Sequence, residues 1–158
     1  MISHPFPPLF DNDSEILILG SFPSVKSREQ QFFYGHPQNR FWKVIAAITD
    51  QPVPETIPQK RELLLSNHIA LWDVIASCEI SGSSDASITN VVPNDLSVIL
   101  ERAAIQRIFC NGNKSFELFQ KHIVPVTGCT AIRLPSTSPA NASRTLEKLI
   151  HAWKIILE

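Results

Sequence analysis

The sequence predicts an α/β fold, a three-layer αβα sandwich with a central four-stranded parallel sheet. Four short apolar runs rich in β-forming residues predict the strands: Glu15–Leu19, Ile69–Ile75, Gln106–Cys110 and Thr130–Leu134. Segments with helical spacing of apolar residues lie between and after these runs. Strands that alternate with helices are typical of a mostly parallel sheet with helices on both faces.

Five segments carry the helical pattern. Arg40–Thr49 has four apolar residues on one face, and the C-terminal segment Asn141–Leu157 repeats this spacing over a longer stretch. The other three are Gln59–Asn67, Asn94–Ala104 and Lys114–His122. We expect Asn94 to be the N-cap of its helix, because Asn is among the residues preferred there.

Composition excludes several classes of protein. The length of 158 residues fits one domain, residues 1–158, and a net charge of −1 indicates no general attraction to nucleic acid, although a local basic face would suffice for binding. Three cysteines without a CxxC spacing argue against a disulfide scaffold and a zinc site. With no signal-peptide pattern and no membrane-length apolar run, the chain is expected to be a soluble cytoplasmic protein without a membrane partner, metal or cofactor.

Ligands of this fold class bind at the carboxyl ends of the strands, which directs attention to the loops that follow them. The first, Gly20–Asn39, is long and rich in aromatic residues, and loops of that kind are usually functional. The second, Ala76–Pro93, contains Ser81–Ser87, which predicts a mobile surface loop. The remaining two are Asn111–Asn113 and Pro135–Asn141.

Some polar side chains near these loops have two interpretations. Asn39 directly precedes a helix, where capping explains it at least as well as catalysis. His36 is either a general base or a structural hydrogen-bonding group. Asp73 is either a solvated or loop-capping residue or placed to read the N–H edge of a base. Cys110 has no His partner in the pattern and fits a buried thiol better than a nucleophile.

The hydroxyl-rich segment Pro135–Asn141 follows the last predicted strand. Its hydroxyl groups and backbone amides suit phosphate oxygens, whereas the alternative for Asn141 and Ser143 is ordinary helix capping. The chain has no GxxxxGK[ST], GxGxxG or GxSxG motif, which removes the common nucleotide, dinucleotide and serine-hydrolase interpretations.

Two motifs resemble those of the uracil-DNA glycosylase superfamily. The first is Gly20-Ser21-Phe22-Pro23-Ser24 followed by His36-Pro37-Gln38-Asn39-Arg40-Phe41-Trp42, and the second is Ser136-Thr137-Ser138-Pro139-Ala140-Asn141. The chain is most similar to the hypoxanthine-DNA (deoxyinosine) glycosylase branch, and mismatch-specific uracil glycosylases share a similar His-Pro-x-Asn-Arg-Phe-Trp stretch. The first motif is long and specific, and the second is short.

The resemblance implies roles for the matched residues. Asn39 would aim a water molecule at C1′ of the sugar, and Asn113 is the other Asn expected near the reacting atoms. The expected contacts to the base come from Gly20, Ser21, Phe22, Tyr34 and Asp73. The expected contacts to DNA come from Ser24, His36, Ser136, Thr137, Ser138, Asn141 and Ser143.

Three positions depart from the superfamily pattern. Phe22 stands where many members have a water-activating Asn or Asp, and Ser136 stands where many have a His that stabilises the departing base. Ala140 matches an intercalating Leu and is too small for a strong wedge.

The implied function is hydrolysis of the N-glycosidic bond of hypoxanthine or uracil in single- or double-stranded DNA by a monomeric enzyme. Because neither motif contains a Lys, no Schiff base is expected, and the enzyme would be monofunctional. The alternatives are a mismatch-specific uracil/thymine glycosylase, an inactive nucleic-acid-binding module of the same fold, and an unrelated hydrolase or transferase acting on a small nucleoside. The sequence alone does not choose the base.

Overall fold

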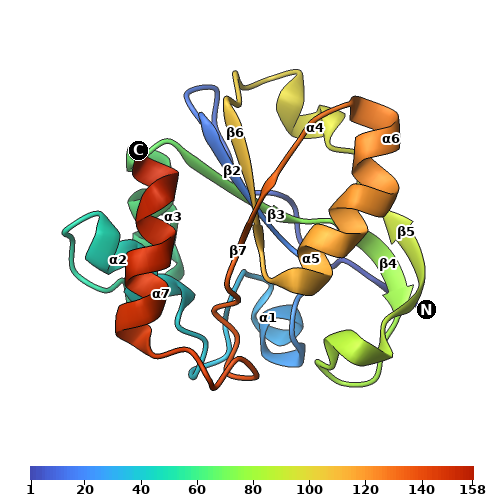
Figure 1. Cartoon of the computed structure of the whole chain (residues 1–158), viewed down its shortest axis with the longest axis horizontal. Coiled ribbons are helices and arrows are strands. Elements are labelled where there is room, and N and C mark those ends of the chain that lie inside the picture. The colour runs from blue at the N-terminus through green and yellow to red at the C-terminus, as the bar shows by residue number, and fades with distance from the viewer.

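A computed structural model describes all residues, 1–158, and its central element is a parallel sheet (Figure 1). The strands are β2 (Ile16–Gly20), β3 (Ile69–Asp73), β6 (Arg107–Asn111) and β7 (Ile132–Leu134), in the order β3-β2-β6-β7. Every residue of β2 and β3 is buried, because helices cover both faces of the sheet. The predicted three-layer fold with four parallel strands is confirmed.

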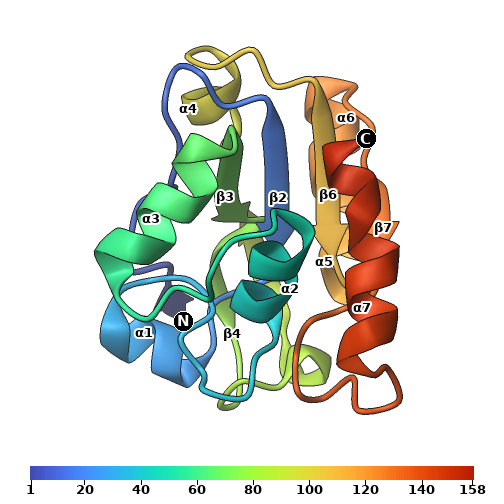
Figure 2. The same cartoon turned by 90° about the vertical axis from the view of Figure 1, so that its left-hand side faces the viewer.

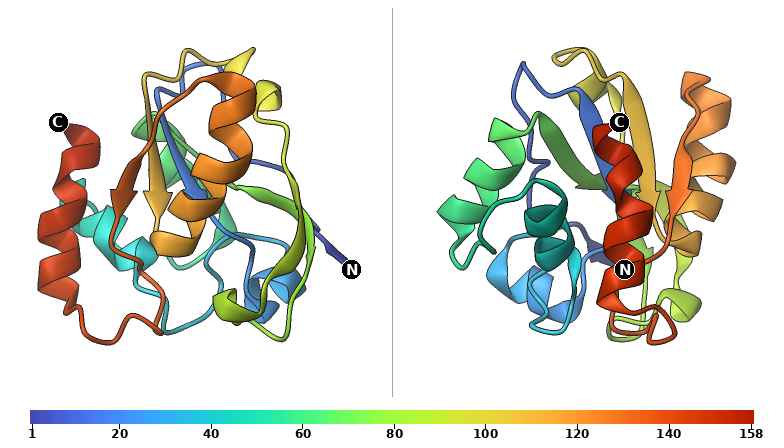
Figure 3. Two further views of the ribbon diagram at one scale, coloured as in Figure 1. Left: turned by 45° about the vertical axis from the view of Figure 1, so that its right-hand side comes forward. Right: turned by 60° about the vertical axis from the view of Figure 1, so that its left-hand side comes forward.

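The helices form the two outer layers. Figures 1 and 3 show α2, α3 and α7 on one face of the sheet and α5 and α6 on the other. The helix bounds are α1 (Val25–Gln30), α2 (Phe41–Ile48), α3 (Ile57–Ser66), α4 (Ser97–Leu100), α5 (Asn113–Leu118), α6 (Val124–Thr127) and α7 (Leu146–Trp153). A π-helical stretch, Phe119–Ile123, joins α5 to α6, and 3-10 turns occur at Asp85–Ser87 and Lys154–Leu157.

A second, antiparallel sheet was not predicted. Its strands are β1 (Ile2–Ser3), β4 (Ile75–Glu79) and β5 (Thr89–Pro93), in the order β1-β4-β5. The prediction of one strand over Ile69–Ile75 is therefore wrong at its C-terminal end. Strand β3 ends at Asp73, and β4 continues the chain into the second sheet. Figure 2 shows β4 leaving the parallel layer toward the N-terminal segment.

Asn94 belongs to this junction rather than to a helix. Its side-chain amide donates to the carbonyls of Asp73 and Ile75, at 2.9 and 3.1 Å. The prediction that Asn94 caps a helix is wrong, and α4 is a single short turn that begins at Ser97. The amide satisfies two carbonyls where the chain changes sheets, which is a different use of the same hydrogen-bonding capacity.

The C-terminal helix is shorter than expected, whereas Ser81–Ser87 lies at the surface as expected. The C-terminal helix begins at Leu146 with Thr145 as its N-cap, so Asn141 and Ser143 lie in the preceding loop. The segment Ser81–Ser87 is held against the first loop, because the backbone N–H of Val25 donates to the Ser83 hydroxyl at 2.9 Å. Ser83 carries no apolar signal, so the pattern of the sequence could not show this contact.

Cys110, which was predicted at the end of a strand, lies in the core. Cys110 is fully buried in β6, and loss of solvation raises the pKa of its thiol to about 11. The prediction of a buried thiol is confirmed.

Among the helices of this chain, none combines the length and the apolar composition that crossing a membrane requires.

Candidate active site

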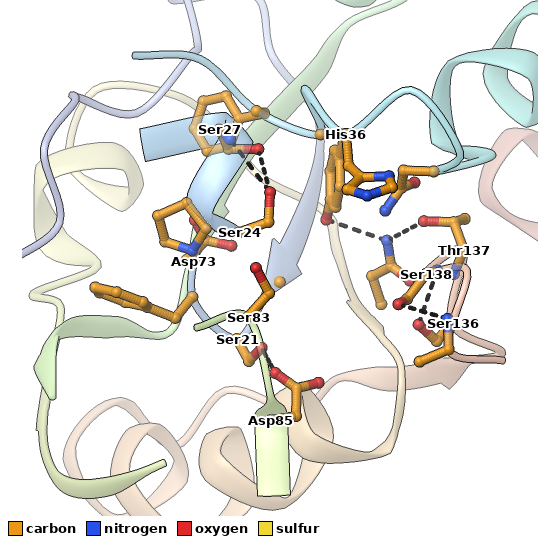
Figure 4. A pocket seen from close by; sticks show the side chains of 18 of the residues that line it. Ser21, Ser24, Ser27, His36, Asp73, Ser83, Asp85, Ser136, Thr137 and Ser138 are labelled. Carbon is orange, nitrogen blue, oxygen red and sulfur yellow. Dashed lines mark hydrogen bonds between the residues drawn. The ribbon is translucent and has the colours of Figure 1, made fainter. Parts of the chain in front are cut away.

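A cavity of about 290 Å³ opens at the carboxyl ends of β2, β3 and β6 (Figure 4). Its walls come from the loop after β2, from the end of β3, from Ser83 and Asp85, from Asn111 and from the segment Ser136–Ala140. Its volume is close to the lower limit of roughly 300 Å³ for small-molecule sites, which suits one flat ligand rather than an extended one. No Lys or Arg lines it.

One side of the cavity is built from Gly20, Asp73 and Tyr34. A Cβ at Gly20 would lie closer than 3.0 Å to Asp73 Oδ1 and 3.1 Å from the Tyr34 hydroxyl, so the glycine is required by close packing. Asp73 is only 4% exposed, and its Oδ2 accepts a hydrogen bond from His4 Nε2 at 2.7 Å. The solvated interpretation of Asp73 is therefore wrong. His4 was not singled out from the sequence, since it lies 69 residues away from its partner.

Tyr34 is fixed by three neighbours. Its ring stacks on Phe41 with a centroid distance of 4.2 Å, its hydroxyl accepts from Asn111 Nδ2 at 3.1 Å, and its carbonyl accepts from Trp42 Nε1 at 3.2 Å. Its backbone φ of +50° is uncommon for a non-glycine residue, so these contacts hold a strained conformation. Burial, and secondarily the charge of Asp73, raise the pKa of the phenol well above its ordinary value, so Tyr34 stays neutral.

Asn39 both lines the cavity and hydrogen-bonds the start of α2, whose N-cap is Arg40. Its Oδ1 accepts from the backbone N–H of Phe41 at 2.9 Å, which satisfies a donor of the first helical turn. Asn39 therefore satisfies a backbone donor at the start of α2 without being its N-cap, which is Arg40, and catalysis stays a prediction. The two roles are compatible, because the hydrogen bond to Phe41 orients the amide in the cavity lining.

His36 also lines the cavity, and its Nδ1 accepts from the Gln38 backbone N–H at 3.1 Å. This bond places the proton of a neutral ring on Nε2. His36 is therefore a hydrogen-bond donor at the mouth of the cavity rather than a free base at Nδ1.

Asn111 joins the two motifs. Its Oδ1 accepts from the Thr137 backbone N–H at 3.0 Å, while its Nδ2 donates to the Thr137 hydroxyl and the Tyr34 hydroxyl (Figure 4). Thr137 is fully buried. Both N–H groups and the carbonyl of Asn111 are therefore engaged within the protein, and the side chain acts as a clamp.

Arg40 holds the second motif from the other side. Its backbone N–H donates to the Thr137 carbonyl at 3.1 Å, and its guanidinium donates to the carbonyls of Ser138, Asn141 and Arg144. A planar guanidinium with several donors is well suited to collect carbonyls in this way. Motifs that lie about 100 residues apart in the chain thereby form one wall.

The hydroxyl groups of the second motif shape its turn. Ser136 Oγ and Ser138 Oγ each accept a backbone N–H two residues ahead, at 3.1 Å. Their contact with DNA stays a prediction. Of the DNA-contact residues expected from the sequence, five line the cavity: Ser24, His36, Ser136, Thr137 and Ser138.

Three expected site residues lie outside the cavity lining. Asn113 is exposed in the first turn of α5, Ser143 is exposed, and Asn141 Nδ2 donates to the Ser136 carbonyl at 2.9 Å. Conversely, Asp85 lines the cavity although no pattern indicated it. Its carboxylate accepts from the Ser21 hydroxyl at 2.8 Å, and desolvation raises its pKa even though the residue as a whole is exposed.

Comparison with known proteins places this geometry in a family. The sequence model of the uracil DNA glycosylase superfamily matches residues 7–157. A hypoxanthine DNA glycosylase of Methanosarcina acetivorans is 37% identical over 143 residues, 89% of each chain, and one of Methanosarcina barkeri is 35% identical over 94% of this chain and 93% of its own. The solution structure of a candidate uracil DNA glycosylase from Methanosarcina acetivorans superposes over the full length of both chains, with a TM-score of 0.81 and 31% identity. The chain therefore belongs to the uracil DNA glycosylase superfamily and is a DNA N-glycosylase.

Proposed function

We propose that the protein hydrolyses the N-glycosidic bond of a deaminated base in DNA, with hypoxanthine favoured and uracil as the second substrate, and leaves an abasic site. The observation that carries this proposal is the cavity itself. It has the volume for one flat ring system, a stacked tyrosine on one wall, and a buried carboxylate but no cation in its lining. Relatives that span almost the whole chain are hypoxanthine DNA glycosylases.

The target nucleotide must leave the duplex to reach this cavity. Flipping costs a few kcal/mol, least for a mispaired base, and deaminated bases mispair. One face of Tyr34 packs on Phe41, so the opposite face is the surface on which the flipped base would stack. The backbone at Gly20–Phe22 would donate to the base oxygen as negative charge develops on the departing base.

Asn39 would position the water that attacks C1′. Its Oδ1 accepts one hydrogen bond from the Phe41 N–H and has a second lone pair for a water hydrogen. An amide cannot remove a proton, so its contribution is orientation toward a sugar with oxocarbenium character. The absence of any Lys from the cavity lining supports a monofunctional reaction without a Schiff base.

A comparison of two side chains that hydrogen-bond helix starts tests this role. Asn39→Ala removes the hydrogen bond to the Phe41 N–H and the proposed water contact together, whereas Thr56→Ala removes the N-cap of α3, which lies outside the cavity lining. Each change is expected to cost about 1 kcal/mol of stability. We expect only Asn39→Ala to slow single-turnover base release from an inosine-containing duplex, by about 100-fold or more. Equal rates for the two variants would refute the catalytic role of Asn39.

The two departures at Phe22 and Ser136 favour a second candidate, a nucleic-acid-binding module without catalysis. Phe22 lines the cavity at the position of the water activator of many relatives, and Ser136 uses its hydroxyl to form a turn. A panel of duplexes with hypoxanthine, uracil, xanthine or thymine opposite each normal base separates the possibilities. Release of thymine above hypoxanthine would indicate a mismatch-specific enzyme, and tight binding without any abasic site would indicate the inactive module.

A further inference from the structure

The N-terminal segment contributes a buried side chain directly behind the cavity. The side chains of His4 and Asp73 are 4% and 5% exposed, and His4 Nε2 donates to Asp73 Oδ2 at 2.7 Å. The His4 ring packs against the edges of Phe6 and Phe22, with centroid distances of 4.6 and 6.0 Å. The His4 backbone N–H donates to the Ala76 carbonyl at 2.7 Å, which ties the segment to β4.

The hydrogen bond to Asp73 determines the tautomer of His4. A carboxylate oxygen only accepts, so Nε2 must carry the proton, and Nδ1 is buried without a partner. A buried ring with one orphaned nitrogen and a buried carboxylate are both costly. The packing of the ring on Phe6 and Phe22 supplies no partner for Nδ1, so the polar pair calls for an explanation in the cavity that Asp73 lines.

Only one oxygen of Asp73 is engaged within the protein. Oδ2 accepts from His4, while Oδ1 packs where a Cβ of residue 20 would be and has no protein donor. Oδ1 is not among the fully buried polar atoms that lack a partner, and Asp73 lines the cavity. Oδ1 is therefore an acceptor that is available to a ligand and fixed in position.

Such an acceptor suits the chemical difference between a deaminated base and its parent. Deamination of adenine converts N1 from a lone pair to an N–H, and deamination of cytosine does the same at N3. A carboxylate accepts a hydrogen bond from that N–H and faces the lone pair of the parent base without a partner. Asn111, the other amide at this edge of the sheet, is fully engaged by Thr137 and Tyr34 and is not free to do this.

We propose that Asp73 determines specificity by testing for the ring N–H that deamination creates, and that His4 is the positioning residue that holds Asp73 for this test. The inference rests on the proposed function, because it assumes that the base enters this cavity. Without His4 the carboxylate loses its only protein donor. It can then rotate away from the position that reads the ring N–H, and discrimination falls.

The test measures binding to duplexes that carry an uncleavable 2′-fluoroarabino inosine or adenosine opposite cytosine. The readout is the ratio of the dissociation constants for the two duplexes. The two duplexes differ in the cost of flipping the base, but this difference is the same for every variant and does not affect a comparison between variants. In Asp73→Asn the amide can rotate to donate to adenine N1, so the preference for inosine should fall by about 10- to 100-fold. A wild-type protein without preference, or an unchanged ratio in Asp73→Asn, would overturn the proposal.

Variants of His4 separate positioning from packing. His4→Phe keeps an aromatic ring beside Phe6 and lacks the donor, whereas His4→Gln places an amide N–H close to the position of Nε2. We expect the binding preference for inosine over adenosine to fall in His4→Phe and to stay within about 3-fold of wild type in His4→Gln. When His4→Phe is combined with Asp73→Asn, the preference should not fall below that of Asp73→Asn alone. If His4→Phe does not fold, His4→Leu, which also lacks a side-chain donor, takes its place. Equal ratios in the donor-lacking variant and wild type would overturn the role of His4.

Base release from inosine-containing DNA by the wild-type protein is measured in parallel. Failure to release hypoxanthine would refute the proposed function, even where the binding ratio depends on Asp73. Release of hypoxanthine with a ratio that is insensitive to Asp73 and His4 would refute only the specificity mechanism.

Discussion

Gly20 is the position at which a single methyl group should do most harm. A Cβ added there would lie closer than 3.0 Å to Asp73 Oδ1, whereas ordinary contacts lie at 3.4–4 Å. The carboxylate would therefore have to move by roughly 1 Å to restore van der Waals contact. The backbone of Gly20 does not have a positive φ, so Gly20→Ala adds this clash without backbone strain.

The cost follows from what holds the carboxylate. Asp73 is buried and accepts from His4 at 2.7 Å, so a shift of this size stretches or breaks a hydrogen bond to a charged group, worth about 1.5–3 kcal/mol. Displacement of a group that positions substrate by 1 Å can lower the rate by about 100-fold. We therefore expect Gly20→Ala to lose about 2 kcal/mol of unfolding free energy and about 100-fold in base release.

Gly35→Ala is the matched control. A Cβ at Gly35 would approach Gln30 Oε1 equally closely, but Gln30 is exposed and its flexible side chain can swing aside. Urea unfolding and single-turnover release of hypoxanthine measure both variants. Wild-type stability and activity in Gly20→Ala, or equal losses in the two variants, would refute the packing argument.

Three further perturbations test other parts of the site. Tyr34 is the only tyrosine, and burial raises the pKa of its phenol. The unfolded chain therefore loses the phenolic proton near pH 10, while the folded chain keeps it. Above pH 10 this group should lower the free energy of unfolding by about 1.4 kcal/mol per pH unit. The ultraviolet absorbance of tyrosinate should then rise only on unfolding. In Tyr34→Phe the free energy of unfolding should fall less steeply with pH in the alkaline range. Ionisation of the tyrosine near pH 10 in the folded protein would contradict this prediction. Desolvation raises the pKa of Asp85, so the folded state disfavours its ionised form, and stability falls as the pH rises from the unfolded pKa through the folded pKa. Thermal unfolding at neutral pH should therefore show that Asp85→Asn is more stable than the wild type. A lower stability of this variant would contradict the desolvation argument. In Arg40→Lys a single ammonium group cannot reach the three carbonyls that the guanidinium holds. Hydrogen exchange in residues 136–144 should therefore accelerate, and base release should fall about 10-fold. Unchanged exchange would contradict the role of Arg40 in holding this segment.

Much of the site could be predicted because its parts follow strands. The runs at β2, β3 and β6 are apolar since both faces of the sheet are covered, and their carboxyl ends place Gly20, Asp73 and Asn111 at one edge. A hydrogen bond from the start of α2 to Asn39 could be expected from its place before the helix, because such bonds are local, although the N-cap itself is Arg40.

Other features depend on where distant segments meet. The split between β3 and β4 does not interrupt the apolar pattern, and it is decided by the pairing of β4 with β1 and β5. Asn94 and Asn111 have the residue type of a cap or a base-reading amide, yet their partners across the chain give them other tasks.

The sequence by itself determined the fold class, the buried strands, the loops that bear the site and the superfamily motifs, because hydrophobic periodicity and short motifs are written in neighbouring residues. Only the tertiary structure decided that His4 stands behind Asp73, that Asp85 reaches the cavity and that Asn113 does not line it. Polar pairs of this kind follow from the position of whole strands and loops in space. Residues as far apart as His4 and Asp73 carry no shared period that would reveal their contact in the sequence.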